Sequence, residues 1–217
     1  MSKGNHEFDI RILYPTFFII FLWLIKLFEI LSGITLYKLG VLPRHVSGLI
    51  GILTYPLIHA SISHLLSNSL PFLILGTGLV YFYKESALKV FFIIYFGSGI
   101  LVWLFARTAY HIGCSGIIYG FGSFLFFSGL IRRDSRAIVL ALLVTFLYGS
   151  LVWGFLPLDA SISWESHVFG ALIGVVCSFV FRKRDVYKRY DWEDEPDDED
   201  GHNLEISYDD PPPDEWK

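Results

Sequence analysis

Residues 88–106 read LKVFFIIYFGSGILVWLFA, and this stretch decides the class of fold. Its only charged residue is Lys89, close to the beginning. The hydrocarbon core of a bilayer is roughly 30 Å thick, and a helix needs about 20 mainly apolar residues to cross it. The stretch is therefore long enough and apolar enough to form one membrane-spanning helix.

Five other stretches of the chain have the same character. The whole sequence is 53% hydrophobic and 18% charged, whereas soluble domains carry about 25% charged residues. We therefore predict an all-α, polytopic membrane protein with six transmembrane helices. The second stretch is too long for one span, so its first part is expected to run along the outer surface before turning inward. The five stretches cover about residues 15–36, 49–83, 115–131, 136–156 and 163–181.

Lysine and arginine residues gather on one side of this six-span arrangement. The side that holds both termini carries Lys3, Arg11, Lys84, Lys89, Arg132, Arg133, Arg136, Arg182, Lys183, Arg184, Lys188 and Arg189. The other side carries Lys38, Arg44 and Arg107. Because positively charged segments stay on the cytoplasmic side, we expect both termini to be cytoplasmic.

Three regions follow from this pattern. Residues 1–14 form a cytoplasmic N-terminal segment, residues 15–182 form the helical membrane domain, and residues 183–217 form an acidic tail. The tail holds most of the acidic residues of the chain, which explains the net charge of -4. Such a segment buries too little apolar surface to fold, so we expect it to be disordered. A role in binding a partner remains open.

Polar side chains within apolar stretches usually face the interior of a bundle and carry function. The informative ones are His64, Asn68, Ser115 and His167. His64 and Asn68 are four residues apart and share one helix face. At about 1.5 Å per residue, His64, Ser115 and His167 lie roughly 21–28 Å above the inner membrane boundary. This common layer predicts a single site. His59, about 140° around a helix from His64, is expected at the entrance of the site rather than beside His64.

Glycines explain how residues of separate helices could meet. Gly113 and Gly116 flank Cys114-Ser115 and permit a tight turn before the fourth span. Gly116, Gly120 and Gly122 form a small-residue face, and Gly170 and Gly174 form another on the sixth span. Such faces let helix backbones approach closely. We predict that the two helices pack face to face, bringing His167 towards Ser115.

Each feature also has a simpler interpretation. The tetrapeptide Gly-Cys-Ser-Gly is weak by itself, a buried histidine often serves as a structural hydrogen-bonding group, and a His/Asn pair can join two helices. The sequence shows no metal-ligand spacing, and we expect no metal and no cofactor. Lys26 and Glu29 lie three residues apart in the first span, and a structural ion pair between them is the favoured interpretation. Asp159 and Glu165 are not assigned as a third catalytic residue.

Three ordered motifs within residues 40–181 carry a family resemblance. Residues 59–68 read HASISHLLSN, residues 111–120 read HIGCSGIIYG, and residues 166–170 read SHVFG. As a set they resemble the rhomboid family of intramembrane serine proteases.

The resemblance implies a catalytic pair in which His167 takes the proton of Ser115, without an aspartate. It implies that the oxyanion is held by the backbone N–H of Ser115 with help from His64 and Asn68. Tyr119 matches a family tyrosine whose ring packs on the catalytic imidazole, and Cys114 stands where alanine is common. The expected substrates are single-span proteins in the lipid bilayer of a bacterial cytoplasmic membrane, and no nucleic acid is expected as a partner.

The sequence departs from the family in the loop after the first span. Many rhomboids have a Trp-Arg pair there, whereas this chain has Leu-Gly-Val-Leu-Pro-Arg44. Two other functions remain open at this point. One is a non-catalytic rhomboid-like protein that binds membrane proteins. The other is a small transporter or channel, although the inverted repeats typical of that class are not found.

Overall fold

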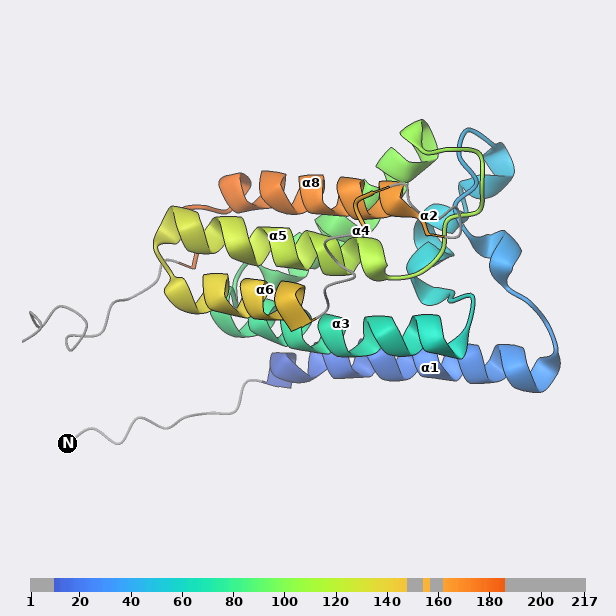
Figure 1. Ribbon diagram of the computed structural model, residues 1–217, viewed down its shortest axis with the longest axis horizontal. Helices are drawn as coiled ribbons and strands as arrows, with labels where there is room; N and C mark the ends of the chain where they lie inside the picture. The colour runs from blue at the N-terminus through green and yellow to red at the C-terminus, as the bar shows by residue number, and fades with distance from the viewer. Residues whose placement is uncertain (1–9, 148–153, 157–161, 186–217) are drawn as a thin grey trace, which may run out of the picture. The chain divides into compact units, whose positions relative to one another are not determined.

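The computed structural model describes residues 10–147, 154–156 and 162–185, and in these residues the chain is helical without any strand (Figure 1). The α-helices are α1 (Tyr14–Ser32), α2 (Gly51–Thr54), α3 (Ile62–Phe82), α4 (Ala87–Phe105), α5 (Ser115–Arg132), α6 (Ser135–Leu147) and α8 (Trp164–Val180). Short 3₁₀ helices are η1 (Ile10–Leu13), η2 (Tyr37–Leu39), η3 (Val46–Gly48) and η4 (Tyr55–Leu57). The predicted all-α class is confirmed.

A long helix occurs in each of the six predicted stretches. Four helical segments are long and apolar enough to cross a membrane: Ile10–Ser32, Ile62–Phe82, Ala87–Phe105 and Ser115–Arg132. α8 has 17 residues and the described part of α6 has 13. Residues 148–153 of the predicted fifth span and the predicted acidic tail from residue 186 onward lie outside the described residues.

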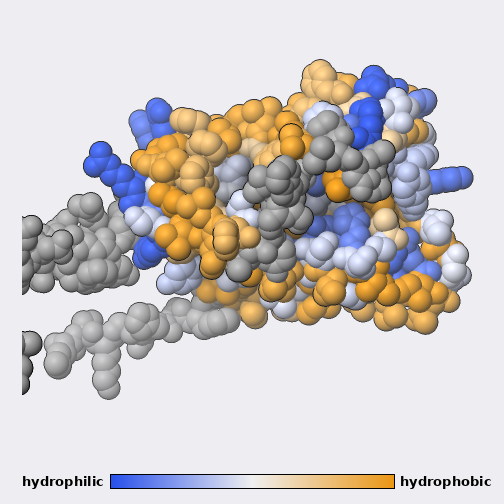
Figure 2. Space-filling model, in the orientation of Figure 1, coloured by the Kyte–Doolittle hydropathy of each residue, from blue (hydrophilic) through white to orange (hydrophobic). Residues whose placement is uncertain are grey.

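The sides of the helices are covered by apolar side chains. Figure 2 shows hydrophobic residues over much of the helical body and strongly hydrophilic residues gathered towards its two ends. On α1, for example, Phe17, Leu24 and Leu31 are each more than half exposed. A soluble protein rarely exposes so large an apolar surface. The chain is a multi-pass membrane protein.

The second predicted stretch divides into two parts. η3, α2 and η4 come first, and the spanning helix α3 begins only at Ile62. Ser61 caps α3, because its hydroxyl accepts a hydrogen bond from the His64 N–H at 3.1 Å. This capping is what fixes the start of the helix. The expected division of the stretch is confirmed.

The loop between α1 and α3 is anchored without a Trp-Arg pair. The Arg44 guanidinium donates to the carbonyl of Ala106 at 2.7 Å and to Thr108 Oγ1 at 3.0 Å, just beyond the end of α4. Val41 and His111 exchange two backbone hydrogen bonds, at 3.0 and 2.9 Å. The loop is therefore tied to the segment that leads into α5.

α5 and α8 lie side by side (Figure 1), and glycines form their contact. A Cβ atom on Gly170 would collide with the carbonyl oxygen of Gly116, and one on Gly174 would collide with that of Gly120. A Cβ atom on Gly116 would lie 2.9 Å from the Ser166 carbonyl oxygen. The predicted face-to-face packing of these helices is confirmed for Gly116, Gly120, Gly170 and Gly174. The prediction for Gly122 is wrong, because this glycine faces Leu75 of α3.

The glycine contact between α5 and α8 predicts that two glycine-to-alanine substitutions differ in their effect on stability. Gly170→Ala should destabilise the protein by about 1–3 kcal/mol, because the added methyl group overpacks a backbone contact. Gly122→Ala is the matched control, since its Cβ would meet only Leu75 Cδ1 at 3.8 Å. Thermal unfolding of both variants in detergent measures the difference. Equal stability of the two would contradict the packing argument.

Candidate active site

A cavity of about 610 Å³ lies at the end of the helices where α5 begins. Its walls come from α3, α5, the start of α8 and the loops around them. The lining includes Tyr37, Ala60, Ser61, His64, Ser67, Asn68, Arg107, Tyr110, His111, Ser115, Tyr119, Ser163 and His167. Polar side chains such as those of His64, Asn68 and Ser115 line it together with apolar ones. The irregular backbone before α5 lines this cavity, as a non-helical segment at membrane depth requires.

Ser115 and His167 meet in this cavity. Ser115 is the first residue of α5, and His167 lies in the first turn of α8. The distance from Ser115 Oγ to His167 Nε2 is 2.8 Å, which is a hydrogen bond between side chains of separate helices. The glycine contact between α5 and α8 begins beside both residues and holds them at this separation.

The second ring nitrogen of His167 fixes its tautomer. Nδ1 lies 2.7 Å from the carbonyl oxygen of Gly154. A carbonyl oxygen only accepts, so Nδ1 carries the proton and the lone pair of Nε2 faces Ser115. In this state the imidazole is ready to accept the hydroxyl proton. Sequence reasoning missed Gly154, because a backbone carbonyl has no residue-type signature.

Tyr119 and Phe155 hold the His167 ring in place. The Tyr119 ring stacks on the imidazole with centroids 4.1 Å apart and planes within 10°. Phe155 meets the Tyr119 ring edge to face at 4.7 Å. The predicted contact of Tyr119 with the imidazole is confirmed, and it leaves the ring little rotational freedom.

His64 and Asn68 face the loop before Ser115. Gly113 has φ of +101°, and a Cβ atom there would lie 2.8 Å from His64 Cε1 and 3.7 Å from Asn68 Nδ2. Glycine is needed for both the backbone angle and this close approach. Among the described buried side-chain atoms without a hydrogen-bond partner, Asn68 Nδ2 is the one whose residue lines the cavity. This atom lies beside Gly113, in the loop before Ser115, and no hydrogen-bond acceptor is found for it among the described residues.

The prediction for His59 is wrong. His59 is buried at 2% exposure, and its ring meets the His64 ring edge to face at 5.0 Å. Its Nε2 also lies 3.4 Å from the Cys114 N–H and 3.6 Å from Cys114 Sγ. The helical angle between His59 and His64 does not apply, since His59 precedes the start of α3. Ser61, a typical N-cap residue, was the sequence signal for that boundary.

Hydrogen bonds also fix the start of α8. His111 Nε2 donates to the Arg107 carbonyl at 3.0 Å, so Nδ1 accepts from Ser163 Oγ at 2.5 Å. Ser163 Oγ in turn lies 2.6 Å from Ser166 Oγ. Burial lowers the pKa of His111 below its ordinary value, which favours the neutral ring.

Glu165, in the first turn of α8, is engaged with Arg107 rather than with the imidazole of His167. Glu165 is buried and pairs with Arg107, with 3.6 Å between Oε2 and Nη1. Asp159 lies outside the described residues. In the described part of the chain, the Gly154 carbonyl is the group that orients His167.

Comparisons with known proteins identify the family of the chain. The model of the Rhomboid domain matches residues 46–184. The chain belongs to the rhomboid family. Rhomboids are generally intramembrane serine proteases. An uncharacterized protein of Mycobacterium tuberculosis is 35% identical over 177 residues, covering 75% of this chain and 72% of the relative. One of Mycobacterium leprae is 30% identical over 172 residues, covering 75% and 68%.

The role of the Gly154 carbonyl leads to a test. A Cβ atom on Gly154 would collide with the Tyr119 hydroxyl and lie 2.9 Å from His167 Nδ1. Gly154→Ala should therefore slow the labelling of Ser115 by a fluorophosphonate probe by about 10- to 100-fold, because the imidazole is displaced. Gly122→Ala should label at the wild-type rate. Unchanged labelling of Gly154→Ala would show that the carbonyl does not orient the base.

Proposed function

We propose that this rhomboid is an active intramembrane serine endopeptidase, with Ser115 as nucleophile and His167 as general base. The observation that carries the proposal is the 2.8 Å hydrogen bond from Ser115 Oγ to His167 Nε2, with the base held in the accepting tautomer. A hydroxyl becomes an effective nucleophile when an oriented base removes its proton during attack.

The reaction is an acyl transfer in two stages. Ser115 Oγ attacks the carbonyl carbon of the substrate peptide bond while His167 Nε2 takes the hydroxyl proton. The resulting imidazolium then protonates the amine nitrogen as the C–N bond breaks, leaving an acyl-enzyme ester on Ser115. Water, deprotonated by the same imidazole, hydrolyses the ester and restores the hydroxyl.

The oxyanion of each tetrahedral intermediate needs donors in place before it forms. Ser115 begins α5, so its backbone N–H lies among the first N–H groups of a helix, which have no intrahelical acceptor. Asn68 Nδ2 adds donors that are buried and unpartnered among the described residues. His64, packed against Gly113, supplies a ring N–H from the same side.

The proposed substrates are single-span membrane proteins cut near the outer boundary of the bilayer. The distribution of lysine and arginine supports cytoplasmic termini, which puts the cavity on the outer side. A polar cavity that opens at that end supports entry of both water and an unwound substrate segment. The chain would therefore act in a bacterial cytoplasmic membrane.

A non-catalytic relative would lack the nucleophile, the base or the contact between them. This chain has the serine, the histidine and their contact. A transporter would use the polar layer as a path across the membrane. Beneath Ser115, however, the layer gives way to apolar packing by Ile117, Phe121 and Leu125, each at most 2% exposed. These observations favour the protease.

Removal of the nucleophile is the first test of the function. Ser115→Ala should abolish cleavage of a reporter transmembrane segment by the purified protein in liposomes, because no other group replaces the hydroxyl. Ser67→Ala is the control: it removes a hydroxyl from the same cavity, and within the described residues that hydroxyl donates to the His64 carbonyl of its own helix. Cleavage by Ser115→Ala at the wild-type rate would refute the proposal.

The oxyanion donor gives a second, graded test. Asn68→Ala should lower kcat by about 10²–10³-fold, the effect typical of losing one such donor. Asn68→Asp, which keeps the shape but presents a carboxylate to the oxyanion, should be at least as impaired. Steady-state kinetics on the reporter measure both. A fall in kcat for Ala but not for Asp would show that side-chain volume, rather than donation, is what matters.

A further inference from the structure

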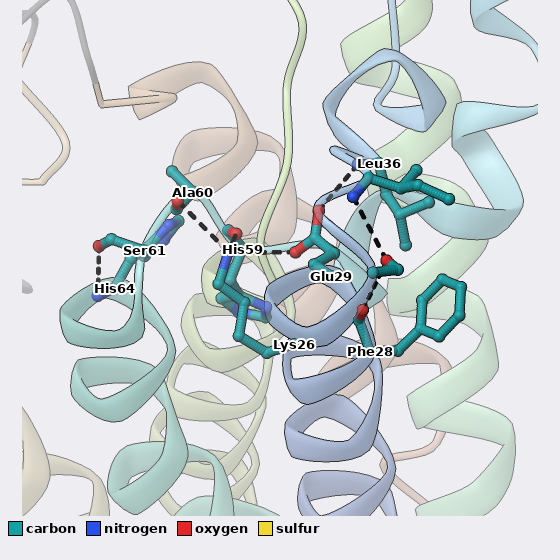
Figure 3. A network of polar contacts seen from close by, with 10 residues as sticks. Lys26, Phe28, Glu29, Leu36, His59, Ala60, Ser61 and His64 are labelled. Atoms are coloured by element: carbon teal, nitrogen blue, oxygen red, sulfur yellow. Dashed lines mark hydrogen bonds and ion pairs between the residues drawn. The ribbon is translucent and has the colours of Figure 1, made fainter.

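An ion pair within α1 connects this helix to the cavity walls (Figure 3). Lys26 Nζ and Glu29 Oε2 are 3.1 Å apart, and the side chains are only 14% and 9% exposed. The predicted pairing of these two residues is confirmed. Charged groups at such depth are expensive and persist where they have partners and a role. The ion pair is one contact of each residue, and each also makes hydrogen bonds to other parts of the chain.

The Lys26 ammonium group donates hydrogen bonds to the turn before α3. Besides Glu29, Nζ donates to the carbonyl of His59 at 2.9 Å and to that of Ala60 at 3.4 Å. An ammonium has three donors, and these three acceptors use them all. The helical hydrogen bonds of α3 begin only with the carbonyl of Ser61, which accepts from Leu65. Lys26 thus supplies donors to the two carbonyls that the helix leaves out.

Glu29 holds the chain on the other side of the same loop. Its Oε1 accepts a hydrogen bond from the backbone N–H of Leu36 at 2.8 Å, while Oε2 accepts from Lys26. Leu36 immediately precedes Tyr37, whose ring meets that of Tyr110 at 5.0 Å. The two charged side chains together fix both ends of the loop that runs from α1 to α3.

The segments held in this way line the candidate active site. Tyr37 lies next to Leu36, and Ala60 and Ser61 follow His59; all three line the cavity. The His59 ring contacts the Cys114 N–H, directly before Ser115, and packs on His64. The carbonyls bound by Lys26 therefore belong to the turn that places two histidines against the nucleophile loop.

We propose that Lys26 and Glu29 form a positioning pair for the active site, through which α1 sets the placement of His59, His64 and the cavity wall at Tyr37. The proposal rests on the proposed protease function. α1 ends at Ser32, ahead of residues 46–184 that match the Rhomboid domain. The first span, which lies outside the matched domain, thus contributes to catalysis through this pair. Donation to the carbonyls is the feature that separates this role from simple charge neutralisation.

Substitutions of Lys26 test the donation. Lys26→Met keeps the length of the side chain and removes all three donors, and it should lower kcat by about 10- to 100-fold through misplacement of the site. Lys26→Arg keeps the charge and the donors and should restore most of the activity. Lys89→Met is the matched control, because Lys89 is exposed in the first turn of α4. It should cleave at the wild-type rate.

An exchange of the two charges separates positioning from neutralisation. The double variant Lys26→Glu/Glu29→Lys retains an ion pair but presents a carboxylate to the carbonyls of His59 and Ala60. A positioning pair predicts kcat as low as that of Lys26→Met, whereas a neutralising pair predicts wild-type kcat. Thermal unfolding in detergent shows whether each variant folds. If Lys26→Met does not fold, the kcat of the charge-exchange variant alone decides between the two roles.

A double-mutant cycle identifies the group through which the pair acts. In a His64→Ala background, Lys26→Met should lower kcat by no more than about threefold, because residues in one network give non-additive effects. Full additivity, or wild-type kcat for Lys26→Met or for the charge exchange, would overturn the positioning role. Absence of Ser115-dependent cleavage by the wild-type protein would instead refute the protease function itself, so the two failures are distinct.

Discussion

The close approach of the α5 and α8 backbones is the contact on which the site depends. Lipid chains are as apolar as leucine side chains, so helices in a bilayer associate through van der Waals packing and hydrogen bonds. Gly116, Gly120, Gly170 and Gly174 remove the side chains that would separate the two backbones. Ser123 Oγ adds a hydrogen bond across the contact, to the Ala171 carbonyl at 2.8 Å. This close approach brings together a serine and a histidine that lie at the starts of the two helices.

The remaining site groups are held by capping and loop contacts rather than by helix packing. Ser61 sets the first residue of α3 and thereby the direction in which His64 and Asn68 point. Val41 pairs with His111 and so fixes the segment that leads to Ser115. These contacts satisfy backbone groups that would otherwise lie unpaired near the membrane interior. The contacts that fix the conformation of these loops therefore also fix the positions of the site residues.

The sequence predicted what depends on composition and helical spacing. Apolar runs located the spans, glycine spacing predicted the α5–α8 contact, and depth brought Ser115 and His167 into one layer. It failed where position depends on the backbone. His59 was misplaced because a helix was assumed to continue through the turn before Ser61. The Gly154 carbonyl was missed because any residue could supply such a group, and only coordinates show where it points.

The burial of His167 explains why a neutral carbonyl, rather than a carboxylate, accepts the hydrogen bond from its Nδ1. A carboxylate beside Nδ1 would bury a full charge next to His167, which is itself only 7% exposed, with a desolvation penalty of several kcal/mol. A backbone carbonyl accepts the same N–H bond as a neutral group and fixes the same tautomer. In the proposed mechanism a carbonyl would stabilise the imidazolium less than a carboxylate, so the base would depend more on ring placement, which Tyr119 provides by stacking at 4.1 Å. In the proposed protease, a neutral acceptor and a stacked ring would together take the part that an aspartate plays beside a catalytic histidine in an aqueous cleft.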